Sequence, residues 1–362
     1  MKYALWLSNI KGIFNGKIKL MRDHYKTAEE IYNLNEQQLK KIKGLTEKDI
    51  ASIITSKDTW NLDKELFKLL EQDVSFVSME QDEYPSKLRN LVDAPYSLYY
   101  KGSLPEDNGL SVAMVGARGR SAYGSQMARK IAQLLADNGI NVISGLARGI
   151  DADGHTGALE TMGEGKTYAV LGCGVNVCYP KQNRYIYDKI LASGGGIISE
   201  YPPDTQPIRT LFPARNRIIA GLSDCVVVIE AKEKSGSLIT ADYAMEQGKD
   251  VYALPGRVTD ALSFGCNYLI KQGAGVIVSP EDFLKEFNIF CENSCSQINF
   301  FEKLLEKDEL LVYSLLDFSP TNLGTLVEKS SMNLVEILEV LGHLKQKGFV
   351  KETMTNYYIR CC

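Results

Sequence analysis

Short apolar runs alternate with longer amphipathic stretches through the middle of the chain. Loops and stretches with helical spacing separate the runs SVAMVG, INVISG, TYAVLG, GGIISE, CVVVIE and DVYALP. Strands that are buried on both faces carry continuous apolar runs, so this alternation predicts an α/β fold with a doubly wound parallel sheet over residues 109–290. Ligands of such sheets bind beyond the carboxyl ends of the strands, where the loops gather.

The chain before this predicted sheet has two parts. The pattern of residues 1–60 predicts short helices separated by glycine turns, with a helix start at Thr27 before Glu29-Glu30. The turn Lys43-Gly44-Leu45 resembles the hairpin of helix-hairpin-helix modules, whose glycine turns approach DNA phosphates. Residues 1–60 are therefore expected to form a helical domain similar to SAM or helix-hairpin-helix domains, and we favour a packing role for it over direct DNA contact. Residues 61–108 are expected to form a transitional segment of short strands and turns.

The pattern changes again in residues 296–362. Three amphipathic helices followed by a β-hairpin predict a winged-helix-like domain. Its third helix carries Glu336 and Glu339, whereas a helix that reads DNA needs basic or amide side chains facing the groove. We therefore favour a structural or protein-binding role for this domain over sequence-specific DNA binding.

Charge is distributed unevenly along the chain, whose formal net charge is −4. Residues 1–60 carry 11 basic and 7 acidic side chains, residues 61–295 carry 23 and 29, and residues 296–362 carry 7 and 9. The central region is thus net acidic, and any polyanion must bind there in a local pocket rather than along a broad basic field.

Composition excludes several other classes of protein. No apolar run is long enough to span a membrane, and the N-terminus has the pattern of a first helix rather than of a signal peptide. The eight cysteines include no CxxC pair and the chain has three histidines, so we expect no metal site. Free cysteines suit a reducing cytoplasm, and the Cys361-Cys362 pair has no evident role.

The segment from Phe212 to Gly256 has the strongest chemical signal. Arg215, Asn216 and Arg217 precede an apolar stretch, and Ser235-Gly236-Ser237 follows a buried strand and opens a helix at Leu238. Backbone N–H groups at such a turn point towards an anion, and nearby arginines suit the same anion. Arginines at alternate positions cannot share one helical face, so one of them is expected to be structural.

Three further loops follow predicted strands, and they are Val115–Gly124 with Arg118, Ser144–Asp151 with Gly145, and Tyr179–Arg184 with Lys181 and Asn183. The first loop lacks the GxGxxG spacing and the second strand does not end in Asp or Glu, so no NAD site is expected. No Walker A motif occurs, so ATP is not expected either. Asp151 is interpreted as a helix cap and His155 as a packed residue.

No nucleophile–base pair has convincing spacing, so we expect no catalytic residue and no cofactor. Glu200 and Glu230 both end predicted strands. In an enzyme they would be the acid or base candidates, and otherwise they would orient the arginines.

Several of these motifs together resemble the DprA/Smf family of DNA-processing proteins. They are VGARGRSAYG, SGLARGIDADGHTGAL, VLGCGVNVCYPKQN, SEYPPDTQPIRTLFPARNRIIAGLS, EAKEKSGSLITADYAMEQGKDVYALPG and CNYLIKQGA. The resemblance covers about residues 80–290. It implies an extended Rossmann-like core in a homodimer that binds and protects single-stranded DNA and loads the recombinase RecA during natural transformation. It also implies that the protein is not an enzyme.

The resemblance also implies which residues bind DNA. The expected set is Arg118, Ser144, Gly145, Lys181, Asn183, Arg215, Asn216, Arg217, Ser235, Gly236, Ser237 and Lys249. The chain departs from the family at Phe264-Gly265-Cys266-Asn267, where a Gly-Thr-Asn turn is usual, so a contact at that loop stays open.

Two alternatives remain at this stage. The first is a nucleotide phosphoribohydrolase of the lysine-decarboxylase-like group, which has a related sheet and phosphate loop. Its PGGxGT signature is absent, and EAKEKSGSLIT stands in the comparable place. The second is a scaffolding role with a vestigial pocket.

Overall fold

The computed structural model describes residues 1–287, 305–317, 320–330 and 332–360. Its contacts form two compact units: a larger one that holds residues 1–120 and 128–278, and a smaller one that holds residues 121–127 and 279–362. Each unit is described by itself. The predicted boundary between residues 290 and 296 and the Cys361-Cys362 pair lie outside the described residues.

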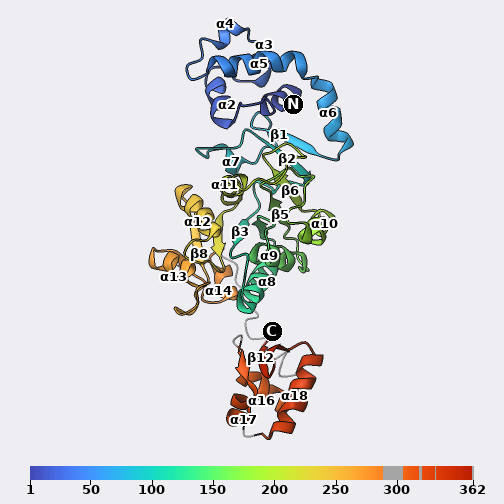
Figure 1. The fold of residues 1–362 in the computed structure, drawn as a ribbon, viewed down its shortest axis with the longest axis vertical. Helices are drawn as coiled ribbons and strands as arrows, with labels where there is room; N and C mark the ends of the chain where they lie inside the picture. Colours follow the sequence, from blue (N-terminus) through green and yellow to red (C-terminus); the bar gives the residue numbers. More distant parts are fainter. Residues whose placement is uncertain (288–304, 318–319, 331, 361–362) are drawn as a thin grey trace. The chain divides into compact units, whose positions relative to one another are not determined.

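The larger unit begins with six helices (Figure 1). They are α1 (Lys2–Ser8), α2 (Asn15–Arg22), α3 (Ala28–Asn33), α4 (Glu36–Leu39), α5 (Glu47–Thr59) and α6 (Leu62–Glu71). Thr27, Asn35 and Thr46 cap three of them through reciprocal side-chain and backbone hydrogen bonds, which satisfy N–H groups that a helix start leaves unpaired. The helix start predicted at Thr27 is therefore confirmed. Trp6 and Met21 are fully buried in the core of these helices.

A nine-stranded sheet follows, with the strand order β1-β2-β6-β5-β4-β3-β7-β8-β9. The strands are β1 (Ser75–Ser78), β2 (Ser97–Gly102), β3 (Ser111–Val115), β4 (Asn141–Ser144), β5 (Thr167–Val170), β6 (Gly196–Ser199), β7 (Cys225–Val228), β8 (Asp250–Ala253) and β9 (Gly275–Val276). From β6 to β9 the neighbours are parallel, as predicted. The sequence did not predict that residues 61–108 extend this sheet: β1 and β2 join it antiparallel, beside β6.

Helices cover both faces of the sheet, so its central strands are fully buried. These helices are α7 (Ser86–Arg89), α8 (Ala122–Asp137), α9 (Ile150–Leu159), α10 (Arg184–Ala192), α11 (Leu211–Leu222), α12 (Gly236–Glu246) and α13 (Phe264–Lys271). Figure 1 shows α9 and α10 on one side of the sheet and α11 and α12 on the other. Val112 and Val227 have no exposed surface, which explains why these strands are uniformly apolar.

The direction of strand addition reverses beside β3. The chain leaves β3 towards β4, β5 and β6, and then returns through α11 to place β7 on the opposite side of β3. Adjacent loops at such a reversal diverge to opposite faces of the sheet, which opens a crevice at the carboxyl ends of the two strands. The fold therefore places its ligand site beyond Val115 and Val228.

The smaller unit contains α14 (Pro280–Lys285), α16 (Lys307–Leu315), β10 (Thr321–Asn322), α17 (Leu323–Ser330), α18 (Leu334–Gln346), β11 (Val350–Met354) and β12 (Tyr357–Arg360). The three strands form a sheet in the order β10-β12-β11. Ile337 and Leu344 of α18 are buried in its core, whereas Glu339 is exposed and Glu336 completes the capping box of Asn333. The exposed face of α18 therefore presents acidic and apolar side chains in its first half, and His343 and Lys345 near its end.

Candidate nucleic-acid interface

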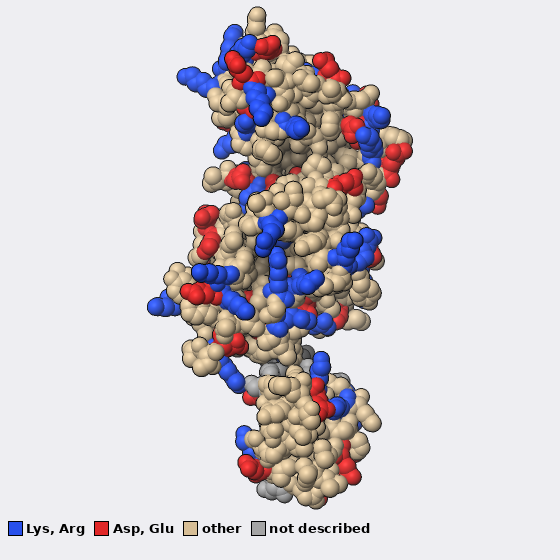
Figure 2. Space-filling view, viewed as in Figure 1, with Lys and Arg blue, Asp and Glu red and all other residues tan. Residues whose placement is uncertain are grey.

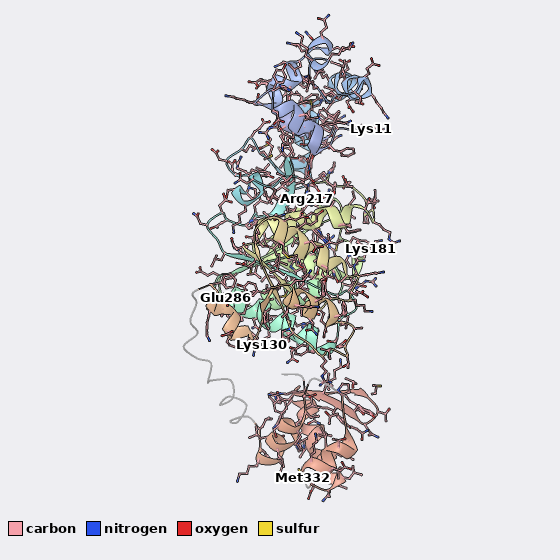
Figure 3. The ribbon with its side chains drawn as sticks, turned by 90° about the vertical axis from the view of Figure 1, so that its left-hand side faces the viewer. Lys11, Lys130, Lys181, Arg217, Glu286 and Met332 are labelled. Atoms are coloured by element: carbon pink, nitrogen blue, oxygen red, sulfur yellow. The ribbon has the colours of Figure 1, made fainter. Side chains whose placement is uncertain are left out.

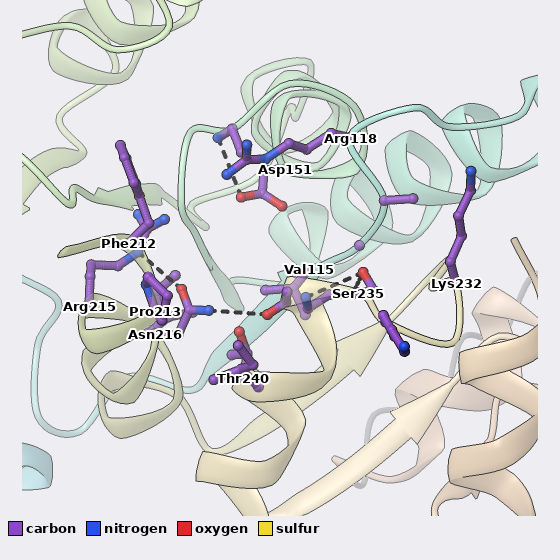
Figure 4. A pocket seen from close by; sticks show the side chains of 18 of the residues that line it. Val115, Arg118, Asp151, Phe212, Pro213, Arg215, Asn216, Lys232, Ser235 and Thr240 are labelled. Atoms are coloured by element: carbon purple, nitrogen blue, oxygen red, sulfur yellow. Dashed lines mark hydrogen bonds between the residues drawn. The ribbon is translucent and has the colours of Figure 1, made fainter. Parts of the chain in front are cut away.

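A pocket of about 720 Å³ lies at the reversal point between β3 and β7. Its walls come from the loop after β3, the loop after β4, the start of α11 and the loop before α12 (Figure 4). Four segments that are far apart in the sequence meet here because parallel strands bring their carboxyl ends to one edge.

The loops after β3 and β4 are packed against each other without space for side chains. Gly149 has a φ of 80°, and a Cβ there would lie 2.2 Å from the Ala117 carbonyl oxygen. Leu146 has a φ of 55°, a conformation that costs an L-residue about 1–3 kcal/mol and persists only where the surroundings enforce it. The backbone of this wall is therefore held in one arrangement before any ligand arrives.

Arg215 forms the floor of the pocket. Its guanidinium donates to the carbonyl oxygens of Gly145, at 3.0 Å, and of Val170, and thereby joins the ends of β4 and β5. A Cβ at Gly145 would lie 2.6 Å from this guanidinium, so only glycine leaves room for it. Arg215 is 5 % exposed and lines the pocket, so its charge is available to a ligand although its side chain is structural.

Asp151 is the one carboxylate among the described residues that line the pocket. Burial raises the pKa of its carboxyl, and the positive charge of Arg215 opposes this rise. Burial likewise lowers the pKa of Arg215 to about 10, which leaves the guanidinium charged at neutral pH. Asp151 also accepts the Ala147 N–H at 3.4 Å. Its interpretation as a helix cap is wrong, because α9 begins at Ile150 with Gly149 as its N-cap and has no side-chain cap.

His155 lies one turn further along α9 and is completely buried. Its Nδ1 is 2.7 Å from the Thr167 hydroxyl, and burial followed by the nearby Arg215 lowers the pKa of the imidazole to about 3. The ring is therefore neutral at physiological pH, and its interpretation as a packed residue is confirmed.

The start of α12 lines the opposite wall. Ser235 caps this helix by accepting the Ser237 N–H at 3.4 Å, and the two hydroxyls are 2.7 Å apart. The helix begins at Gly236 rather than at the predicted Leu238. Asn216 donates to the Gly236 carbonyl oxygen at 3.3 Å and so ties α11 to this turn. The predicted residues Ser235, Gly236, Ser237 and Asn216 thus come together in the pocket.

Exposed cations surround the opening, and most of them were missed by the sequence analysis. Arg118 was predicted, but Arg209, Lys232 and Lys234 were not. Two lysines in the loop that directly follows a central strand are a signal that could have identified the latter pair. Figure 4 shows Arg118 beside Asp151 and Lys232 on the loop before α12, and Figure 2 shows lysine and arginine side chains gathered on this unit.

An aromatic pair lies at the edge of the pocket. The rings of Tyr179 and Phe212 both line it, with their centroids 5.4 Å apart, and Tyr179 is 44 % exposed. Exposed aromatic rings are surfaces on which unpaired nucleic-acid bases can stack.

Three predicted residues lie behind or beside the pocket rather than in its lining. The buried Ser144 hydroxyl donates to the Met114 carbonyl oxygen at 2.6 Å. The buried Asn183 amide donates to the carbonyl oxygens of Leu146 and Ala147 and supports the loop after β4. Lys181 is exposed in a 3₁₀ turn, Lys181–Asn183, and Figure 3 shows it at the margin of the unit.

The structure gives Arg217 and Lys249 other partners and does not bring them to the pocket. Arg217 projects from α11 away from Arg215 and pairs with Glu200 through two hydrogen bonds, at 2.9 and 2.6 Å. Lys249 donates to the carbonyl oxygens of Ala220, Gly221 and Ser223 at the end of α11. Glu200 orients Arg217, and neither Arg217 nor Lys249 lines the pocket, so their contact with DNA stays a prediction that the pocket does not support.

The extent of α11 also differs from the prediction. It begins at Leu211, so Arg215, Asn216 and Arg217 lie within the helix rather than before it. Pro213 is tolerated because it lies in the first turn, where its missing N–H would have had no partner.

The described residues contain no group of three or more His, Cys, Asp or Glu side chains that could hold a metal ion. Among the helices of the same residues, none is both long and apolar enough to cross a membrane.

The fold and the pocket define a doubly wound α/β protein with a pocket rich in cationic side chains at its reversal point. A model of the family described as DNA recombination-mediator protein A matches residues 75–288, and the chain belongs to this family. The resemblance to DprA/Smf proteins is thereby confirmed. The family is one of DNA recombination mediators and not of enzymes.

Relatives and solved structures agree with this assignment. The chain is 46 % identical to the DNA processing protein DprA of Streptococcus pneumoniae over 225 residues, 62 % of this chain and 78 % of that protein. It is 40 % identical to Protein Smf of Synechocystis over 287 residues, 78 % of this chain and 71 % of that protein. The crystal structure of the S. pneumoniae protein matches with a TM-score of 0.70 at 38 % identity, over 79 % of this chain and 98 % of that one.

Loss of the Arg217–Glu200 pair should lower the stability of the fold without removing a side chain from the pocket. Both side chains are nearly buried, with 6 and 9 % exposed. Arg217→Ala leaves Glu200 charged and unpaired, so we expect the free energy of unfolding to fall by about 3–5 kcal/mol in urea titrations. Arg184→Ala removes an exposed pair with Asp188 and is the matched control, with an expected loss of about 0–1 kcal/mol. Equal losses in the two variants would contradict a buried role for Arg217.

Proposed function

We propose that the chain binds single-stranded DNA in the pocket between β3 and β7. The observation that carries this proposal is the charge of the pocket: Arg118, Arg209, Arg215, Lys232 and Lys234 face a single carboxylate, within a region that is net acidic. Such a site holds a short stretch of phosphate backbone and does not bind a long polyanion through a broad field.

The aromatic pair supports a single strand rather than a duplex. Tyr179 and Phe212 can stack only on bases that are not paired and buried inside a double helix. A solved structure titled for the single-stranded DNA binding mode of DNA processing protein A from Helicobacter pylori matches with a TM-score of 0.52 at 31 % identity. It covers 59 % of this chain and 95 % of that one.

The wider role that the family resemblance implies belongs to the same proposal. The bound strand would be protected and passed to the RecA recombinase during natural transformation, in the cytoplasm and by a homodimer. The phosphoribohydrolase alternative is not favoured, since no observation supports a catalytic acid or base in the pocket. The one carboxylate among its described lining residues, Asp151, accepts the Ala147 N–H, and the positive charge of Arg215 opposes the rise of its pKa.

Removal of two rim cations is the sharpest test. For about four phosphates neutralised, the slope of log K against log salt is about −3 for single strands. Arg118→Ala with Lys232→Ala should change this slope to about −1.4 and weaken binding of an oligothymidine at least about tenfold, measured by fluorescence anisotropy. Both side chains are exposed, so the fold is retained.

The matched control is Lys64→Ala with Lys271→Ala, which removes two exposed lysines that do not line the pocket. This variant should keep the wild-type slope. The proposal fails if the two double variants bind the oligonucleotide equally well, or if the wild type has no preference for single strands over duplex in the same assay.

Protonation of the Asp151 carboxyl should make the affinity for DNA depend on pH. Its carboxylate opposes phosphate when ionised, so affinity should rise as the pH falls through its raised pKa and the carboxyl takes up a proton. Asp151→Asn keeps an oxygen for the Ala147 N–H but removes the charge. We expect it to bind the strand about fivefold more tightly at neutral pH, or by about 1 kcal/mol, and to lack the gain at low pH. Weaker binding, or an unchanged pH profile, would contradict this electrostatic role.

A further inference from the structure

The N-terminal helices contain an internal repeat. The turn Ile10-Lys11-Gly12-Ile13 recurs as Ile42-Lys43-Gly44-Leu45, and these segments are named here the paired glycine turns. Flanking apolar positions repeat in the same register, so that Leu7, Ile18 and Met21 correspond to Leu39, Ile50 and Ile53. All six are buried, which shows that the two copies use the same positions for their common core.

The two copies also have the same backbone. Gly12 and Gly44 adopt φ values of 84° and 98°, in the left-handed region that favours glycine. In each turn the residue after the glycine donates its N–H to the isoleucine carbonyl, at 3.1 Å in the first and 3.4 Å in the second. A short helix precedes each turn, α1 or α4, and α2 or α5 follows it.

Contacts between equivalent positions relate the copies to each other. Lys17 and Asp49 occupy the same position in the repeat, and they form an ion pair with one another. The second turn packs on the first copy, since a Cβ on Gly44 would lie 2.9 Å from the Leu20 side chain. When two copies are related by a two-fold axis, residues at the same position in each copy can contact each other across that axis. The contacts therefore indicate an approximate two-fold axis between the two copies.

The turns present donors and positive charge to solvent. The N–H groups of Gly12 and Gly44 have no hydrogen-bond partner in the described part of the chain, and both glycines are exposed. The exposed lysines on or beside the turns that form no ion pair among the described residues are Lys11, Lys19, Lys41, Lys43 and Lys48. Phe14, directly after the first turn, is 76 % exposed. Figure 3 shows Lys11 on this helical part of the chain.

We propose that the paired glycine turns form a second nucleic-acid site, which binds the two phosphate backbones of a DNA duplex. The strands of a duplex are related by two-fold axes, so a protein surface with the same symmetry can contact both strands in one way. Backbone N–H groups and lysines bind phosphates without reading bases, so the site is independent of sequence. Residues 1–60 are net positive, by 11 basic to 7 acidic side chains, unlike the acidic region that holds the pocket.

This inference goes beyond the single-strand function, and it reverses the preference of the sequence analysis for a domain that only packs. Only the second glycine turn resembles a hairpin in sequence, but in the structure the first turn has the same backbone, and contacts between equivalent residues relate the two. One turn would be an isolated phosphate contact. Two turns related by an approximate two-fold axis share the symmetry that relates the two strands of a duplex.

Reversal of one lysine charge on each turn tests the proposal in the full chain. Lys11→Glu with Lys43→Glu should weaken binding of a blunt DNA duplex of about 20 base pairs at least about tenfold at moderate salt, and make the salt slope less negative by about 1.8. Binding of a short oligothymidine should stay within about twofold of wild type, because the pocket is unchanged.

The control is Lys64→Glu with Lys271→Glu, which gives the same change in net charge at exposed positions outside both sites. The proposal is overturned if the wild type does not bind the duplex, or if the turn variant and the control bind it equally. Loss of oligothymidine binding in the pocket variant with duplex binding retained would support two independent sites. A wild type that binds the duplex but no single strand would reject the proposed function and leave this inference standing.

Discussion

The pocket depends on one buried cation, the guanidinium of Arg215. It joins the carboxyl ends of β4 and β5 through two backbone carbonyls, and its charge is compensated by Asp151. The arginine, the two carbonyl groups that hold it and the glycine that makes room for it form a single unit. The same guanidinium that stabilises the loops supplies positive charge at the floor of the site, and stability and binding are therefore coupled at this residue.

The sequence predicted the parts of the fold that burial determines. Uniformly apolar runs identified the six parallel strands from β3 to β8, because only a doubly covered sheet buries both faces of a strand. It could not show that β1 and β2 extend the sheet, since their alternation suits any edge strand. It also placed the start of α11 too late, because Pro213 was not recognised as a residue of the first turn.

The candidate site was predicted less completely, because side-chain direction is not encoded in a motif. Arg215 and Arg217 have the same residue type and are two positions apart, yet one lies under the pocket and the other pairs with Glu200. Lys249 is basic, but its donors cap the end of a helix. Conversely, Lys232 and Lys234 lie within the quoted segment EAKEKSGSLIT but were not among the expected contacts, and they reach the opening through the position of their loop.

The repeat in the N-terminal helices has a consequence for how this part of the chain folds. Each copy contributes only a few apolar side chains, and neither encloses a core by itself, since the buried residues of both belong to one cluster. A segment of about 15 residues is too short to fold alone. Removal of either copy, even by a truncation that leaves the other intact, would therefore unfold both, so this region gains or loses its structure as one cooperative element.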